Sequence, residues 1–256
     1  MARVFGEPGR NAAEKSHKET RRVLLTAFVG MGLFAVIWGY TLNGLFPMPK
    51  LSLVGAVLVF AIVVALMSVI SNWSLKKIDA IDRNRLAWRK GAVGEHLVAE
   101  VLRGLPNDFI VVNDVTKRFA NIDHIVIGPT GVYVIDTKNW KGTVAANGNG
   151  ELLVNGKATQ KPSVKTTLRA TMDFQSKLKA LAEKDYFVRG LMVFPLAYVE
   201  ANFGSTGHIH CLRDERLVDY IQNQTFSTKL DADDIARIKR ATLQLAQMDQ
   251  QFVGKT

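Results

Sequence analysis

The 256-residue sequence has a single cysteine, Cys211, and several familiar motifs are missing from it. One thiol can form neither a disulfide framework within the chain nor a cysteine-based zinc site. The five histidines are scattered and include no HExxH pattern, and no GxxxxGK[ST] loop occurs. The chain therefore carries no zinc site of the HExxH type and no ATP motor of the P-loop type.

Acidic residues are fewer than basic ones. The sequence has 23 Asp and Glu against 33 Lys and Arg, which gives a formal net charge of +10. A basic balance favours partners such as nucleic acid or an anionic membrane surface, and it does not choose between them.

Charge is absent from two long apolar runs near the N-terminus, Val23 to Phe46 and Leu51 to Ile70. Each run is long enough to cross a hydrocarbon core about 30 Å thick. Since only a short segment separates them, we expect a tight hairpin of two transmembrane helices. The alternative is a buried helical pair in a soluble core. Because neither run contains a charge, the spans are expected to serve as an anchor rather than a transport path.

The charges that flank the two runs predict their orientation. Arg21 and Arg22 precede the first run, Lys76 and Lys77 follow the second, and the connecting loop has only Lys50. The positive-inside rule then places both termini on the cytoplasmic side. We therefore expect a multi-pass protein of the cell membrane whose soluble domain is cytoplasmic.

The most informative feature of the soluble part is a predicted β-hairpin. Two runs rich in β-branched and aromatic residues, 122–127 and 132–135, flank the turn sequence Gly-Pro-Thr-Gly. If Pro and Thr form a two-residue loop, Asp123 faces Asp136 on the neighbouring strand, and Lys138 points the same way. A three-residue loop would shift this register by one position. Both faces of the hairpin are apolar, which predicts a central position in a covered sheet.

Two opposed carboxylates repel each other, and a divalent cation between them would remove that repulsion. The alternative is a pair of solvated acids at the strand end, neutralised by Lys138.

A helix is expected over residues 75–105, and Gly91 or Gly94 would mark a break in it. In its second part, Glu95 shares a stripe with Val98 and Leu102 at helical spacing. A carboxylate turned inward beside small glycines is a candidate ligand or base. The alternative is a boundary glutamate whose head reaches water.

The remaining pattern predicts an α/β sandwich in which the last strand joins by a crossover connection. The expected elements are strands at 109–115, 143–145, 152–154, 188–194 and 208–212, and helices at 162–183, 214–222 and 231–252.

A row of basic residues begins the helix expected at 162–183. Lys161, Lys165 and Arg169 recur at four-residue spacing, and Lys141 lies in a nearby loop. Phosphate contacts need such a cationic row, although a solvated helix face has the same pattern.

Four segments, in this order and at these spacings, resemble the nuclease-related (NERD) domain of the PD-(D/E)xK restriction-endonuclease-like superfamily. They are Gly91-Ala92-Val93-Gly94-Glu95, Asn121-Ile122-Asp123-His124-Ile125-Val126-Ile127, Gly131-Val132-Tyr133-Val134-Ile135-Asp136-Thr137-Lys138-Asn139 and Lys141-Gly142. The resemblance implies an α-β-β-β-α-β core, here preceded by the transmembrane hairpin.

By the same resemblance, Glu95 is the helix acid, Asp123 the metal-binding aspartate, Asp136 the second acid and Lys138 the motif lysine. The main-chain carbonyl of Thr137 would add a metal ligand. Many relatives have glutamate where this chain has Asp136. The implied cofactor is Mg²⁺ or Mn²⁺. The implied activity is that of a metal-dependent phosphodiesterase that acts on nucleic acid, and DNA is favoured over RNA as the partner.

We therefore expect a membrane-anchored nuclease. The alternatives are a catalytically silent nucleic-acid-binding module at the membrane and a membrane scaffold for protein interaction. The expected divisions are a basic N-terminal segment at 1–22, an anchor at 23–70, a helical linker at 71–90, a nuclease-like core at 91–200 and a completing segment at 201–256.

Overall fold

The structure is a computed structural model of the whole chain, and part of the chain is described here. The described residues are 1–9, 83–115, 121–201, 209–223 and 229–253, with residue 81 and single positions between 15 and 32. The chain divides into two compact units, one of residues 1–12 with 90–256 and one of residues 13–89.

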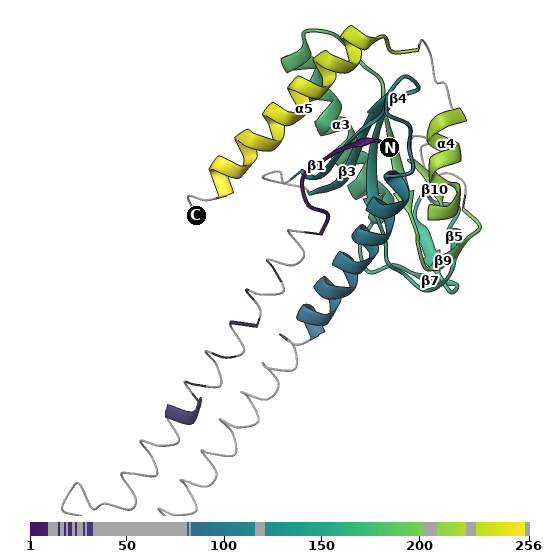
Figure 1. The fold of residues 1–256 in the computed structure, drawn as a ribbon. Helices are drawn as coiled ribbons and strands as arrows, with labels where there is room; N and C mark the ends of the chain where they lie inside the picture. The colour runs from purple at the N-terminus through teal and green to yellow at the C-terminus, as the bar shows by residue number, and fades with distance from the viewer. Residues whose placement is uncertain are drawn as a thin grey trace, which may run out of the picture. The chain divides into compact units, whose positions relative to one another are not determined.

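The first unit is built on a six-stranded sheet with the order β1-β2-β3-β4-β8-β10 (Figure 1). Its strands are β1 Arg3–Phe5, β2 Ile110–Val115, β3 Ile122–Gly128, β4 Gly131–Thr137, β8 Val188–Val193 and β10 Ile209–Leu212. Strands β2, β3 and β4 are antiparallel neighbours, whereas β8 lies parallel to β4, and β10 lies parallel to β8.

The chain crosses from β4 to β8 through helix α3, Ser163–Ala182. A helix over residues 83–102 precedes β2. Counted over the main-sheet strands β2, β3, β4 and β8 and these two helices, the order is the expected α-β-β-β-α-β. This mixed α/β arrangement is consistent with a nuclease-like core. The parallel β4–β8 pair also confirms the predicted crossover connection.

The hairpin has the predicted two-residue loop. Gly128 pairs with Gly131, and Ile125 pairs with Val134. The ladder ends at the pair of His124 and Ile135, so Asp123 and Asp136 are the next positions in the same register. The predicted register is thus confirmed, and it places the two acids at the open end of the hairpin.

Both faces of the central strands are covered, as the sequence predicted. On one face, Ile125 and Val134 pack with Phe174 of α3 and with Ile238 of α5, Ala232–Val253. Helices α3 and α5 lie together on this side in Figure 1.

The opposite face has a separate core. There Val126 and Tyr133 pack with Leu102 of the helix over 83–102 and with Leu217 of α4, Leu217–Asn223. A short 3-10 helix, η1 (Asp214–Arg216), leads into α4. Strands that are apolar on both faces are thereby buried between two helical layers.

The expected break at Gly91 or Gly94 is wrong, because the helix runs without interruption from residue 83 to residue 102. Gly94 serves a close approach instead: a Cβ atom there would lie 2.7 Å from Cβ of Asn139. Among the described residues, no atom lies within 4 Å of a Cβ atom placed at Gly91.

Two features were not predicted from the sequence. Strand β1 adds the N-terminal residues to the edge of the main sheet, parallel to β2. A second sheet has the order β7-β6-β5-β9, formed by β5 Gly142–Ala146, β6 Leu152–Val154, β7 Lys157–Ala158 and β9 Ala197–Val199. Its antiparallel β5–β6 pair corresponds to the strands expected at 143–145 and 152–154.

The predicted transmembrane runs lie outside the described residues, apart from a few positions of the first. Across the part of the chain that is described, no helix combines the length and the apolar character needed to span a bilayer.

Candidate active site

The candidate site lies at the end of the β3–β4 hairpin, and Asp136 is at its centre. Its Oδ1 atom accepts a hydrogen bond of 2.9 Å from Nζ of Lys138, with which it forms an ion pair. Its Oδ2 atom accepts a 2.6 Å hydrogen bond from the hydroxyl of Thr167 on α3. Both oxygens of this half-buried carboxylate are therefore held by donors from two different elements.

Asp123 lies beside it on β3. Its Oδ2 atom accepts a 2.6 Å hydrogen bond from the backbone N–H of Thr137. Burial and the negative charges of Asp136 and Glu95 raise the pKa of Asp123 well above its ordinary value, against the opposing effects of Thr137 and Lys138. The site therefore concentrates negative charge that its own cation only partly offsets.

Glu95 reaches the same cluster from the helix over residues 83–102. Burial and the charge of Asp114, with a smaller effect of Asp136, raise the pKa of Glu95 to about 7. A hydrogen bond from the backbone N–H of Gly9 and the charge of Lys138 act in the opposite direction. The predicted inward-facing glutamate is thus half-buried and lies within electrostatic reach of the other acids.

Lys138 is a firmly held cation. Burial alone would lower its pKa, but the charge and hydrogen bond of Asp136, with the charges of Asp123 and Glu95, raise the pKa above its ordinary value. Its backbone N–H donates a 2.8 Å hydrogen bond to the carbonyl of Val193, which ties the segment after β4 to β8.

The structure therefore brings together Glu95, Asp123, Asp136 and Lys138, the four residues singled out by the sequence. The helix supplies the first acid, and adjacent strands supply the other two. The close packing of this helix against the end of β4 depends on Gly94, which leaves room for Asn139 and Thr137 beside the helix.

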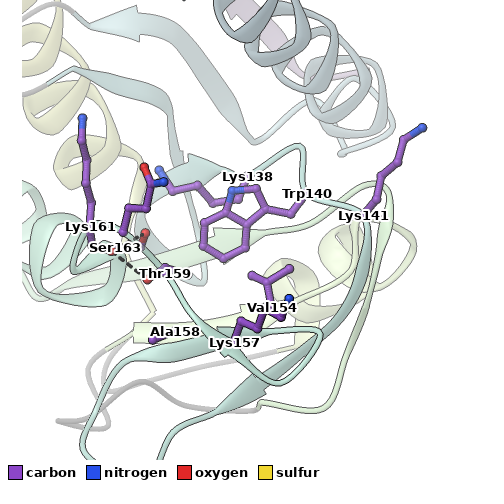
Figure 2. Close-up of a pocket in the computed structure, with 10 residues that line it drawn as sticks. Lys138, Trp140, Lys141, Val154, Lys157, Ala158, Thr159, Lys161 and Ser163 are labelled. Carbon is purple, nitrogen blue, oxygen red and sulfur yellow. Dashed lines mark hydrogen bonds between the residues drawn. The ribbon is translucent and has the colours of Figure 1, made fainter. Parts of the chain in front are cut away.

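The predicted basic residues are distributed differently. Lys161 precedes α3 instead of lying on its face, since the helix begins at Ser163. It lines a cleft together with Lys138 and Lys141 (Figure 2). Lys165 and Arg169 are exposed on α3 itself.

Three residues of the site were missed by the sequence argument. Asp114 lies on β2 across from Asp123 of β3. Its two neighbours on β2, Asn113 and Val115, pair with the two neighbours of Asp123. The other two are Gly9, which contacts Glu95, and Thr167. An acid near the end of the strand next to the hairpin was a usable signal for Asp114. Nothing in the sequence pattern pointed to Gly9 or Thr167.

The donor set fits a hard divalent cation. Within the described ranges, no three His, Cys, Asp or Glu side chains are arranged to hold a metal ion. Mg²⁺ needs less than that, because it usually takes one or two carboxylates and keeps several waters. Asp123 and Asp136 supply such a pair, and they are close enough that the charge of Asp136 raises the pKa of Asp123.

With this geometry described, one comparison with known proteins concerns the central part of the chain. Residues 90–195 match the family model described as "Nuclease-related domain", NERD. The matched segment is similar to that family, and it contains all four residues of the cluster.

Two further comparisons are more limited. An uncharacterized protein of Bacillus anthracis is 43% identical over 61 residues, which cover 22% of this chain and 29% of that protein. The matched segment is thus less than a third of that relative's length. The structure of Pyrococcus furiosus SfsA in complex with Ca²⁺ aligns over 61% of this chain and 53% of that chain, with 14% identity and a TM-score of 0.22.

Proposed function

We propose that this protein is a divalent-metal-dependent nuclease with a restriction-endonuclease-like core. The observation that carries the proposal is the convergence of Glu95, Asp123, Asp136 and Lys138 at one end of the sheet, within the segment that is similar to the nuclease-related family. Three acids and one lysine have no evident structural need to meet there, since charged groups at the end of a buried sheet are costly.

Hydrolysis of a phosphodiester requires an activated water and neutralisation of charge on the phosphate. Asp123 and Asp136 would hold Mg²⁺ or Mn²⁺, and Glu95 and the main-chain carbonyl of Thr137 would be further oxygen donors if they approached the ion. The bound ion would make a coordinated water more acidic and stabilise negative charge in the transition state.

The surroundings of the lysine indicate its part in the reaction. An ammonium group whose pKa is raised by Asp136 and its neighbours keeps its proton near neutral pH. Lys138 is therefore better suited to bind a phosphate oxygen than to deprotonate water. Thr137 and Thr167 are positioning residues, because each fixes one carboxylate through a hydrogen bond.

The proposal is tested with the full chain. A fragment that starts at residue 75 would lose strand β1 and the contact of Gly9 with Glu95. Labelled DNA and RNA substrates, single- and double-stranded, are incubated with Mg²⁺ or Mn²⁺ and with EDTA. We expect metal-dependent cleavage that Lys138→Ala abolishes. Replacement of Lys179, an exposed lysine farther along α3, by alanine should leave the cleavage unchanged. Full activity of Lys138→Ala would refute its catalytic role.

A silent binding module is the second candidate, and one observation favours it. Both oxygens of Asp136 are already satisfied by Lys138 and Thr167, so the cluster is partly neutralised without any ligand. Binding of nucleic acid without cleavage under any metal condition would support this candidate over the nuclease.

We also propose that residues 23–46 and 51–70 anchor the domain to the cell membrane, with both termini in the cytoplasm. Residues 1–12 and 90–256 belong to one folded unit. Since the intervening segment leaves and re-enters the same unit, it would cross a membrane an even number of times. This agrees with the two spans expected from the sequence.

The topology is tested by labelling intact cells with an impermeant thiol reagent. Native Cys211 is buried, so it is replaced by alanine and single cysteines are introduced at Asn43 and at exposed Lys179. We expect reaction at position 43 alone. Labelling at position 179 alone would show that the orientation is the opposite one.

A further inference from the structure

A cleft of about 600 Å³ adjoins the candidate site. Lys138 belongs to both, and the residues that follow it in the sequence, together with those that precede α3, form the walls (Figure 2). The cleft therefore offers a path by which a bound chain would reach the acidic cluster.

The cleft is strongly cationic. Lys138, Lys141, Lys157 and Lys161 all line it. Among the described residues, the last three form no ion pair, so their charges remain available to an anionic ligand. Figure 2 shows Lys161 on one side of the cleft and Lys141 at the other, extending outward. Phosphate groups are the biological anions that such spaced lysines bind well.

The nearby N-terminus of α3 is not available to a phosphate. The two carboxylate oxygens of Glu151 accept hydrogen bonds of 3.0 and 2.9 Å from the backbone N–H groups of Val164 and Lys165. The helix end is thus already capped by an internal anion. Recognition in the cleft must come from the lysine side chains and from the ring beside them.

That ring is the indole of Trp140, which Figure 2 shows in the middle of the cleft between Lys138 and Val154. It is half-buried, and its contact with Phe194 is tilted, with ring centroids 5.5 Å apart and an interplanar angle of 47°. An aromatic ring within a row of lysines is the combination that binds single-stranded nucleic acid, because unpaired bases stack on it. Bases inside a duplex are stacked on one another and cannot do so.

We propose that the cleft binds a single-stranded segment of nucleic acid, with one base stacked on Trp140 and its phosphates against Lys157 and Lys161. The strand would then continue past Lys138 to the acidic cluster. This inference deepens the proposed function by naming single strands as the substrate class. The competing role for Trp140 is purely structural, as a cover over Phe194 and Val154.

The test measures binding of three labelled ligands to the full-length protein by fluorescence anisotropy, in EDTA so that no cleavage occurs. The ligands are a thymidine oligonucleotide, an abasic sugar-phosphate strand of the same length, and a duplex. Base stacking is worth about 1–3 kcal/mol, so we expect Trp140→Ala to weaken binding of the oligonucleotide by about 5- to 150-fold. Trp140→Phe, which keeps an aromatic face, should cost about threefold or less.

The abasic strand separates stacking from charge. Trp140→Ala should leave its binding unchanged, whereas Lys161→Ala should weaken both strands and reduce the salt slope by about 0.7. Lys179→Ala, at an exposed position of α3 away from the cleft, is the matched control and should change the binding of neither strand. In the wild type, the oligonucleotide should bind at least fivefold more tightly than the abasic strand.

Equal wild-type affinity for the two strands would overturn the proposal, and this comparison does not depend on how any variant folds. An equal loss on both strands in Trp140→Ala would also overturn it, since a merely structural tryptophan predicts that result. Single-strand binding that depends on Trp140, without cleavage in any metal, would uphold this inference while the nuclease proposal fails. If cleavage is confined to duplexes and Trp140→Ala is fully active, the nuclease proposal is upheld and the single-strand inference fails.

Discussion

The hydroxyl of Thr167 donates a 2.6 Å hydrogen bond to Oδ2 of Asp136, which joins helix α3 to the acidic end of strand β4. Thr167 is buried, and its hydroxyl also lies 3.0 Å from the carbonyl of Ser163. Because this donor is held on a helix, it gives the Asp136 carboxylate a defined position.

Replacing Thr167 by valine should therefore impair the proposed reaction without unfolding the domain. A hydrogen bond to a charged group contributes about 1.5–3 kcal/mol, which corresponds to a loss of roughly 10- to 100-fold in kcat. Thr167→Ser retains the hydroxyl and should restore most of the rate. Cleavage assays at saturating substrate check this, and a serine variant as slow as the valine variant would contradict the assignment.

Binding of a divalent metal should stabilise the folded chain. At a metal concentration of about 100 times Kd the gain is about 2.7 kcal/mol, which raises Tm by about 5–10 °C in a domain of this size. Asp123→Asn should lose that shift, and without metal it should be at least as stable as the wild type, because it removes one of several repelling charges. Thermal melts with Mg²⁺, Mn²⁺ and EDTA measure this. A full shift in Asp123→Asn would exclude Asp123 as a ligand.

The metal-free protein should lose stability as the pH rises through the range in which Glu95 ionises. Its pKa is about 7 in the folded chain and 4.5 ordinarily, so the folded state holds the extra proton between these values. The stability tied to that proton is fully present below pH 4.5 and is lost by the time the pH has risen past 7. At pH 8, Glu95→Gln should exceed the wild type by up to about 3 kcal/mol, whereas near pH 4 the two should agree. Urea unfolding in EDTA tests this, and parallel curves at all pH values would contradict it.

Gly94 should tolerate no side chain, in contrast to its neighbour Gly91. A Cβ atom at Gly94 would lie 2.7 Å from Cβ of Asn139, so Gly94→Ala forces the helix away from the end of β4. Overpacking of this kind typically costs about 1–3 kcal/mol. In Gly91→Ala, the new Cβ atom has no neighbour within 4 Å in the part of the chain that is described, and the change should stabilise the helix by about 0.5–1 kcal/mol. Urea unfolding of both variants measures the difference, and equal effects would refute the close-approach role.

The sequence by itself determined the hairpin and predicted that Asp123, Asp136 and Lys138 lie at its end, and the structure decided that the loop has two residues. The prediction was possible because the pattern is local: a two-residue loop fixes which positions face each other, and alternation fixes the side on which Asp136 and Lys138 lie. Apolar residues on both faces likewise predicted a covered central sheet, and the two separate cores bear this out.

Only the tertiary structure revealed the parts that depend on distant segments. Strand β1 is three residues long and gains its partners only by pairing with β2, more than a hundred positions away. The contributions of Gly9, Asp114 and Thr167 come from contacts between different elements. The periodic pattern of side chains along a single helix or strand cannot predict such contacts. The cleft around Trp140 forms for the same reason, because its walls come from two stretches of chain that are adjacent only after folding.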